Sequence, residues 1–214
     1  MTTRPTRNSV AYVRDIKGDR PNRIRAWPQK GREPPEGPFM GQAPELSALF
    51  VLDVAQVSIP VGGTTKTFSN PRTDPDGRVW WYVRAYDRDT KTVKDGWVAE
   101  NEGGQVLLES LPSHDGCTAL MHTQRPSHLW DGMQACVVPA IGLIIRSDPL
   151  NTASVVGGLP VGSVVTVTGE AHCDTDGLVW WRIPKDWICE NEPIQGPPDE
   201  DGVAWYLLPM RSQP

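Results

Sequence analysis

The chain repeats a short aromatic motif at an offset of 100 residues. Residues 76–81 read Asp-Gly-Arg-Val-Trp-Trp, and residues 176–181 read Asp-Gly-Leu-Val-Trp-Trp. At the same offset, Ile-Pro-Val-Gly at residues 59–62 returns as Leu-Pro-Val-Gly at residues 159–162. A period this long that occurs twice indicates two copies of one small domain, because a solenoid needs several short stacked repeats.

A third pair of segments follows the aromatic motif. Residues 96–102 read Gly-Trp-Val-Ala-Glu-Asn-Glu, and residues 186–192 read Asp-Trp-Ile-Cys-Glu-Asn-Glu. Duplicated small β units more often duplicate a binding surface than a catalytic centre, so we expect a non-catalytic protein. We expect no cofactor, since the sequence holds no glycine-rich phosphate loop followed by a helix. The repeated carboxylates at Asp74 and Asp174 fall in predicted turns, where Asp accepts backbone hydrogen bonds.

The composition favours short strands joined by many turns. Proline accounts for 21 and glycine for 20 of the 214 residues, and no stretch keeps a helical period over three turns. Residues 163–168 are β-branched almost throughout, which is typical of a strand. The sequence therefore predicts an all-β fold of short antiparallel strands that form small barrels. No apolar run approaches the ~18 residues of a membrane span.

The repeat divides the chain into segments of different character. The prediction, in chain order, is a basic arm (1–19), a first barrel (20–112), an irregular linker containing Cys and His (113–137) and a second barrel (138–214). The first barrel is expected to carry insertions relative to the second, at about residues 31–50 and 84–94. Long connections in small domains are often functional, so both insertions are candidate contact surfaces.

Charge is distributed unevenly along the chain. Through Arg32 there are nine Lys and Arg against two Asp, although the net charge of the whole chain is −5. Within residues 1–23, few apolar side chains lie outside residues 10–13. We expect an extended arm that is ordered only against a partner, and its charge would suit nucleic acid, an anionic polymer or an acidic protein. A solvated, partly disordered tail that needs no ligand is the preferred interpretation of the charge.

An ordered series of short motifs occurs in both repeats. It runs as Ile-Arg followed by Pro, then Pro-x-Gly, then Gly-x-x-Trp-Trp, and then Trp-Val or Trp-Ile. The series occupies residues 24–28, 59–62, 77–83 and 96–98 in the first repeat and residues 145–149, 159–162, 177–183 and 187–188 in the second. It resembles the bacterial SH3-like domain. Asp186 departs from that pattern, because a glycine normally precedes the last Trp.

The resemblance implies an all-β protein with two small SH3-like barrels in tandem. Domains of this family are usually non-catalytic targeting modules beside cell-wall hydrolases, and they bind peptidoglycan peptides or proteins. The resemblance thus implies recognition of a peptide, glycan or protein surface, with a cell-wall ligand as the first choice. Family members are generally exported, whereas residues 1–7 lead into no apolar signal segment. A structural or accessory subunit of an intracellular or viral assembly is therefore the alternative, and a peptidoglycan hydrolase or zinc enzyme a distant one.

Period-two alternation assigns the aromatic side chains to faces. If Trp81 and Trp181 point into the cores, their neighbours Trp80 and Trp180 point to the opposite face and are expected to be the more exposed. Tryptophan provides a large contact area at low entropic cost. The expected ligand-binding residues are Trp80, Tyr82, Trp97, Trp180, Arg182 and Trp187. The alternative is that these rings cover a barrel end or the interface between the two domains.

The predicted linker concentrates residues that bind metals. Its candidates fall within 23 residues and are His114, Cys117, His122, His128 and Cys136. They form only a weak zinc candidate, because their spacing matches no standard zinc finger. A Cys117–Cys136 disulfide is an alternative in an oxidising compartment. Free thiols in a reducing cytosol are the preferred interpretation, and the state of Cys173 and Cys189 is left open.

Overall fold

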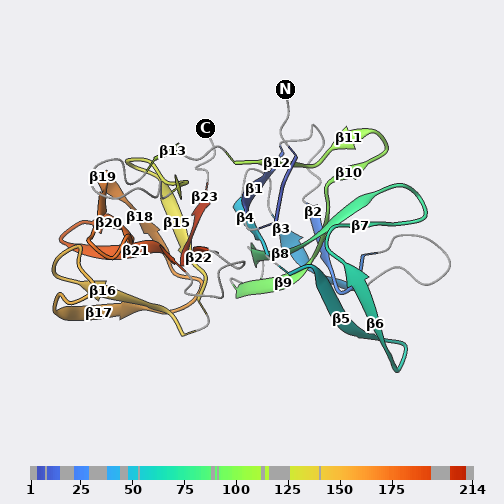
Figure 1. Ribbon diagram of the computed structural model, residues 1–214, viewed down its shortest axis with the longest axis horizontal. Helices are drawn as coiled ribbons and strands as arrows, with labels where there is room; N and C mark the ends of the chain where they lie inside the picture. Colours follow the sequence, from blue (N-terminus) through green and yellow to red (C-terminus); the bar gives the residue numbers. More distant parts are fainter. Residues whose placement is uncertain are drawn as a thin grey trace. The chain divides into compact units, whose positions relative to one another are not determined.

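The fold is all-β, as predicted (Figure 1). The computed structural model describes residues 4–7, 9–14, 22–28, 38–43, 48–52, 54–87, 90, 92–111, 114–115, 126–139, 141–193 and 203–210. Every regular element in these ranges is a strand, and they contain no helix that is long and apolar enough to cross a membrane. The chain divides into two compact units, unit 1 (residues 1–111) and unit 2 (residues 112–214).

Unit 1 is built on one antiparallel sheet. Its strands are β1 (Ser9–Val13), β2 (Asn22–Arg25), β3 (Phe39–Ala43), β4 (Ala48–Val51), β5 (Gln56–Val61), β6 (Thr64–Ser69), β7 (Arg72–Thr73), β8 (Val79–Asp87), β9 (Thr92–Ala99), β10 (Asn101–Glu102), β11 (Gln105–Val106) and β12 (Leu108–Ser110). The sheet has the order β12-β1-β4-β8-β9-β2-β3, with β7 also paired to β8. Two separate hairpins, β5–β6 and β10–β11, complete the unit.

Unit 2 uses two smaller antiparallel sheets. Its strands are β13 (His114–Asp115), β14 (Pro126–Ser127), β15 (Gln134–Val137), β16 (Leu143–Arg146), β17 (Val155–Leu159), β18 (Val164–Thr166), β19 (Thr168–Cys173), β20 (Val179–Ile183), β21 (Asp186–Pro193), β22 (Val203–Trp205) and β23 (Leu207–Met210). One sheet has the order β18-β15-β23 and the other β17-β16-β21-β20-β19, with β22 paired to β21. The hydrogen-bonded sheets of the described residues do not close into barrels.

The two units pair equivalent strands in the same register. Arg25 of β2 lies opposite Trp97 of β9, and Arg146 of β16 lies opposite Trp187 of β21. The register also shifts immediately before each arginine, in β2–β3 and in β16–β17. By these registers β1, β2, β3, β4, β8, β9 and β12 correspond to β15, β16, β17, β18, β20, β21 and β23.

This correspondence of strands changes which residues of unit 1 match one of the repeated motifs. Residues 159–162 span the end of β17, whose counterpart is β3, and a proline follows the last residue of each strand, Pro44 and Pro160. Residues 59–62 lie instead in the β5–β6 hairpin, which has no counterpart in unit 2 because β18 leads almost directly into β19. The predicted match of residues 59–62 with 159–162 is wrong. Both are Pro-x-Gly turns, a combination that many unrelated turns share.

Among the described residues, two extra segments of unit 1 are hairpins. The larger is β5–β6, which lies outside the predicted insertion at residues 31–50. The other lies at residues 84–94, where β8 and β9 extend to the pair Asp87–Thr92. In unit 2 the corresponding β20–β21 pairing already ends at Ile183 and Asp186.

Two segments predicted to lie outside the barrels are instead parts of the sheets. Strand β1 falls in the predicted basic arm, but it pairs with β4 and β12, and Ala11 and Val13 lie in the core. Strand β15 falls in the predicted linker, but it pairs with β18 and β23, and Ala135 and Val137 lie in the core. The predictions of an extended arm and an irregular linker are wrong at these strands. A few apolar residues suffice when both neighbouring strands complete their hydrogen bonds.

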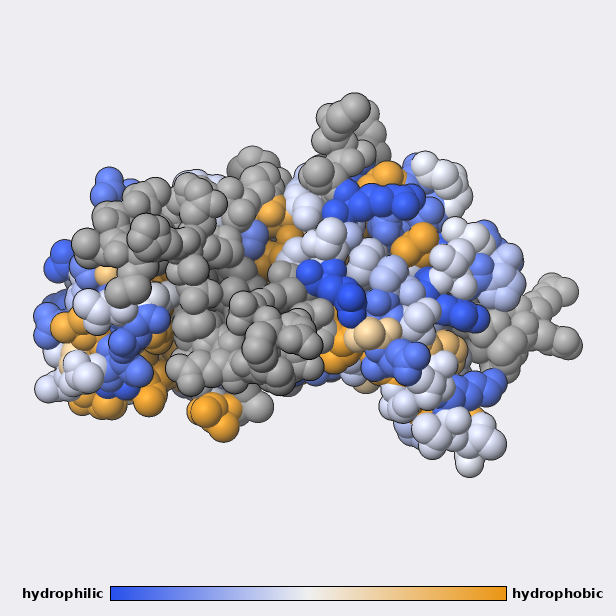
Figure 2. All heavy atoms as spheres, viewed as in Figure 1, coloured by the Kyte–Doolittle hydropathy of each residue, from blue (hydrophilic) through white to orange (hydrophobic). Residues whose placement is uncertain are grey.

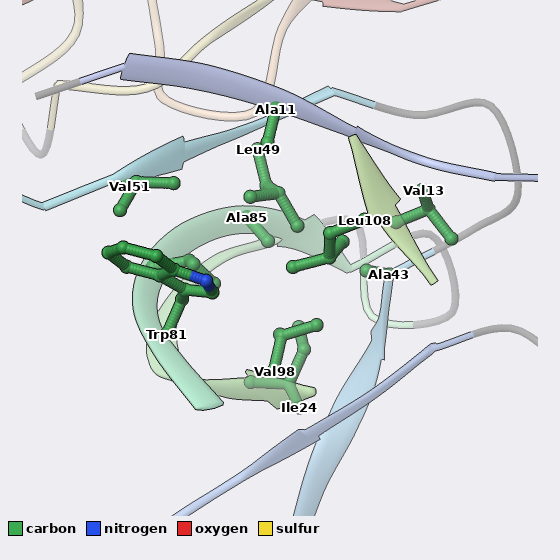
Figure 3. Packing of buried hydrophobic residues seen from close by; sticks show 11 residues of the cluster. Ala11, Val13, Ile24, Ala43, Leu49, Val51, Trp81, Ala85, Val98 and Leu108 are labelled. Atoms are coloured by element: carbon green, nitrogen blue, oxygen red, sulfur yellow. The ribbon is translucent and has the colours of Figure 1, made fainter. Parts of the chain in front are cut away.

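Each unit has its own main core around a repeated tryptophan. In unit 1, Trp81 packs with side chains of six further strands, and Figure 3 shows this cluster inside the curve of β8. In unit 2, Trp181 packs in the same way with Leu129, Val137 and Ile188. The predicted burial of both tryptophans is confirmed, since their exposed fractions are 6% and 2%.

Candidate functional site

The first tryptophan of each pair is fixed by the turn that precedes it. Asp74 Oδ1 accepts hydrogen bonds from the backbone N–H groups of residues 76 and 78, both at 2.9 Å, while its Oδ2 accepts the Trp80 indole N–H at 3.0 Å. Asp174 binds Trp180 in the same way at 2.9 Å. Each Asp therefore connects a turn to an indole, which is a structural role.

The expected exposure of these two indoles is wrong. Trp80 and Trp180 are each 2% exposed. Alternation correctly places them on the face opposite the main core, because Trp81 and Trp181 belong to the main clusters and they do not. That opposite face, called the outer face here, carries a second apolar layer in each unit. Pattern alone does not reveal a second layer that comes from other segments.

The second tryptophan of each pair binds a buried glutamate. Trp81 Nε1 donates to Glu100 at 2.8 Å, and Trp181 Nε1 donates to Glu190 at 2.7 Å. Both carboxylates are almost fully buried, with exposed fractions of 3% and 0%. A buried carboxylate needs several donors to offset its desolvation.

The two glutamates obtain their remaining partners differently. Glu190 also accepts the Ser127 hydroxyl at 2.6 Å and the backbone N–H of His128 at 2.8 Å. Glu100 instead forms an ion pair with Arg4 at 3.0 Å, although the Arg4 side chain is 75% exposed. In both units a segment that precedes the first core strand reaches the same carboxylate position. Part of the predicted basic arm thus has an intramolecular acidic partner.

A hairpin covers the outer face of unit 1. Val57 and Phe68 of the β5–β6 hairpin belong to the same cluster as Trp80 and Trp97. The ring centroids of Phe68 and Trp97 lie 6.1 Å apart in an edge-on arrangement, and those of Tyr82 and Trp97 lie 5.3 Å apart. Trp97 is fully buried, and its indole N–H has no hydrogen-bond partner among the described residues. The predicted ligand-binding residues of unit 1 lie together, but beneath the hairpin.

The outer face of unit 2 has no such cover in the described residues. Trp187 is half-buried, and it meets the exposed His172 edge-on at 6.0 Å between centroids. Arg182 lies opposite Trp187 in the register and is exposed. On the adjoining strands, Ile144 and Val155 are 48% and 60% exposed. Figure 2 shows hydrophobic side chains gathered over the part of unit 2 that carries β16 and β17.

The six predicted ligand-binding residues therefore divide into two groups. Tyr82 is half-buried beside the buried Trp97, whereas Arg182 and Trp187 lie on the more open face. Sequence reasoning missed Ile144, His172 and Val155 as neighbours on that face. Ile144 could have been found, because it stands between Leu143 and Ile145, which alternation assigns to the core.

The zinc candidate remains mostly outside the described residues. Cys117 and His122 lie outside them, and so does the side chain of His114. His128 and Cys136 are both buried. Burial raises the pKa of the Cys136 thiol to about 12, which disfavours the thiolate that zinc requires. The described residues contain no group of three or more potential metal ligands.

The described cysteines differ in state. Cys136 is a free thiol, so the alternative of a Cys117–Cys136 disulfide is wrong. Its side chain lies inside unit 2, on strand β15. Cys173, at the end of β19, is disulfide-bonded.

Comparisons of the chain with protein-family models, with curated proteins and with solved structures find no match. Function must therefore be inferred from the geometry of the two units. The feature that distinguishes them is the outer face, which a hairpin covers in unit 1 and leaves open in the described part of unit 2.

Proposed function

We propose that the chain is a non-catalytic binding protein made of two SH3-like units, which recognises a protein or peptide surface. The observation that carries this proposal is the outer face of unit 2, where aromatic, aliphatic and cationic side chains lie together and are partly exposed. Exposed apolar surface of this kind marks contact sites on soluble proteins. Aromatic and arginine side chains are also the residues that most often dominate binding energy.

The SH3-like relationship is supported by the positions of the shared motifs. The Ile-Arg pairs end β2 and β16, and the Trp-Trp pairs lie on β8 and β20. The following Trp-Val and Trp-Ile pairs lie on β9 and β21, in equivalent registers. The proline after β3 and β17 adds a further shared position at Pro44 and Pro160. The series of motifs therefore coincides with a shared order of strands.

The structural roles of the four buried carboxylates support a non-catalytic function for the protein. Asp74, Asp174, Glu100 and Glu190 all accept hydrogen bonds from tryptophan side chains. These bonds assign each of the four carboxylates a structural task. The proposal therefore places recognition on the outer surface, in agreement with the expectation from the duplicated sequence.

A direct binding experiment tests this function. The full chain would be incubated in parallel with purified peptidoglycan, for sedimentation, and with a protein extract of its source, for crosslinking and mass spectrometry. We expect saturable, stoichiometric capture of a protein, whereas saturable sedimentation with peptidoglycan would assign the cell-wall ligand that the family resemblance implies. Release of soluble fragments from the peptidoglycan, or saturable binding to neither material, would refute the proposal.

A further inference from the structure

The outer faces of the two units can be compared position by position. Trp97 in unit 1 corresponds to Trp187 in unit 2, since each lies opposite the arginine of the neighbouring strand. On the other side, Trp97 lies opposite Tyr82 and Trp187 lies opposite Arg182. Trp97 shares a smaller apolar cluster with Trp80, and Trp187 packs against one that contains Trp180. The same platform is therefore present twice.

Unit 1 shows what such a platform accommodates. The β5–β6 hairpin places Val57 and Phe68 opposite each other in its register, and both belong to the cluster that buries Trp97. Its other side is polar, with the Ser58 and Thr67 hydroxyls 2.8 Å apart and exposed. The element that fits the platform is thus an extended β-segment with apolar side chains at alternate positions.

The described residues of unit 2 contain no such covering hairpin, and the platform there has apolar side chains at the surface. Ile144, Val155 and Val156 are 48%, 60% and 51% exposed. Val156 is the residue at which the β16–β17 register shifts, and such bulges re-aim side chains. Strand β17 is an end strand of its sheet. Aliphatic surface therefore extends from Trp187 toward an edge strand.

Two substitutions between the platforms define the chemistry of the occupant. Tyr82, which packs against Trp97 under the hairpin, is replaced by the exposed Arg182. Arg72, which lies opposite Trp80, is replaced by His172, which contacts Trp187. A segment that covers Arg182 binds most tightly when it supplies a carboxylate, because a covered guanidinium needs an acceptor to replace its hydration and a charged acceptor does so best.

We propose that the outer face of β16, β20 and β21 docks an extended β-segment of a partner protein. That segment carries apolar side chains at alternate positions and a carboxylate that pairs with Arg182. On β20 and β21 it takes the place that the β5–β6 hairpin takes on β8 and β9 of unit 1, and from there it extends over the exposed Ile144 of β16. This inference deepens the proposed function and rests on it, because it names the surface and the kind of partner.

A peptide copy of the hairpin is the probe. The backbone N–H of Asn70 donates to the carbonyl of Ala55 at 2.9 Å, so a peptide of residues 55–70 has adjacent ends and can be made cyclic. A fluorescein-labelled cyclic peptide would be titrated with the full chain and followed by fluorescence anisotropy. We expect saturable binding, at least about fivefold weaker for Ile144→Asp, since a charge on the platform opposes docking of apolar side chains.

Ile141→Asp is the matched control. Ile141 is 100% exposed and lies outside the three strands of the platform, so this variant should bind the peptide within about twofold of the unmodified chain. Both variants replace exposed side chains, and unchanged circular dichroism would verify folding. Failure of the peptide to bind, or equal binding by both variants, would overturn the docking proposal.

A charge exchange tests the role of Arg182. Lys66 lies opposite Ile59 in the hairpin, on the same side as Val57 and Phe68. A Lys66→Glu peptide should bind the unmodified chain about two- to fivefold more tightly than the parent peptide. The preference should reverse for Arg182→Glu. If both peptides show the same order of affinity with both chains, the proposed carboxylate partner is wrong.

The same variants separate this inference from the proposed function. A protein captured by the chain should be lost with Ile144→Asp and retained with Ile141→Asp. If Ile144→Asp captures it undiminished, the protein binds elsewhere, so the docking surface is wrong and the binding function stands. If the chain captures neither a protein nor peptidoglycan, the proposed binding function is wrong, whether or not the cyclic peptide binds.

Discussion

Equivalent strands form the outer faces of the two units, but the two faces differ in what covers them. In unit 1 the β5–β6 hairpin supplies Val57 and Phe68, and Trp97 is fully buried. In unit 2 the chain passes from β18 to β19 without a hairpin, and Trp187 remains half-buried beside exposed His172. One tryptophan position thus has a structural role in one unit and is available for contact in the other. The two units share the platform, and the β5–β6 hairpin of unit 1 accounts for the difference in cover.

The buried glutamates show a second difference between the units. Glu190 obtains its donors from buried or backbone groups, whereas Glu100 depends on an exposed arginine. Hydrogen bonds within a buried site keep most of their strength in salt, but an ion pair with an exposed group is screened. We therefore expect the packing around the carboxylate to be more robust in unit 2 than in unit 1.

The largest expected effect concerns the core tryptophans. Trp181→Ala should destabilise unit 2 by about 3–5 kcal/mol, because it leaves a large cavity and removes one of the donors of a buried carboxylate. Trp81→Ala should do the same to unit 1. Hydrogen exchange followed by mass spectrometry would report each unit separately. Trp130→Ala is the matched control, since Trp130 is 40% exposed. Equal losses from Trp181→Ala and Trp130→Ala would contradict the assignment of the core.

The next effect compares the two buried glutamates. Glu190→Ala should cost about 3 kcal/mol, because donors from three residues lose their acceptor. Glu100→Ala should cost about 1–2 kcal/mol, because the released arginine returns to water. Urea unfolding, with the exchange rates of each unit as a second readout, would measure both. A larger loss for Glu100→Ala would reverse the comparison between the units.

Sequence predicted the fold class and part of the repeat, for identifiable reasons. The Asp-Gly-x-Val-Trp-Trp motif could be recognised in both units because the turn after Asp74 and the turn after Asp174 lead into β8 and β20 without an insertion. The match at residues 59–62 fails because differences in loop length elsewhere cancel at the same offset. Equivalent strands could be identified only from their pairing, as between β3 and β17. A short strand such as β1 has too few residues to show a period of its own.

The sequence predicted correctly on which face of the sheet the candidate residues lie, but it did not predict how exposed they are. Alternation placed Trp80 and Trp180 opposite the main cores, which is where they lie. Their burial depends on side chains distant in sequence, such as Val57 over Trp80 and Tyr206 near Trp180. Such contacts leave no local pattern. The aliphatic side chains on the same face as Trp187 were also missed, because the predicted site consisted almost entirely of aromatic residues.

A smaller effect tests the hairpin as a cover. Phe68→Ala should destabilise unit 1 by about 1–2 kcal/mol and should increase quenching of tryptophan fluorescence by acrylamide, because Trp97 loses its edge-on neighbour. Thr67→Ala, on the exposed side of the hairpin, is the control and should change neither quantity. His172→Ala, at the corresponding face of unit 2, should cost less than about 0.5 kcal/mol. If Phe68→Ala leaves the quenching unchanged, the hairpin does not protect Trp97.

The smallest effect concerns the ion pair between Arg4 and Glu100. The Arg4 side chain is 75% exposed, so Arg4→Ala should cost only about 0–1 kcal/mol in a buffer of low salt. A double-mutant cycle with Glu100→Gln isolates the interaction, because Arg4→Ala should have no effect once the carboxylate is neutral. The coupling should vanish at about 1 M salt, where the screening length falls to about 3 Å. A coupling that persists at high salt would show that Arg4 holds Glu100 as firmly as Ser127 holds Glu190, and the two units would then be equally robust.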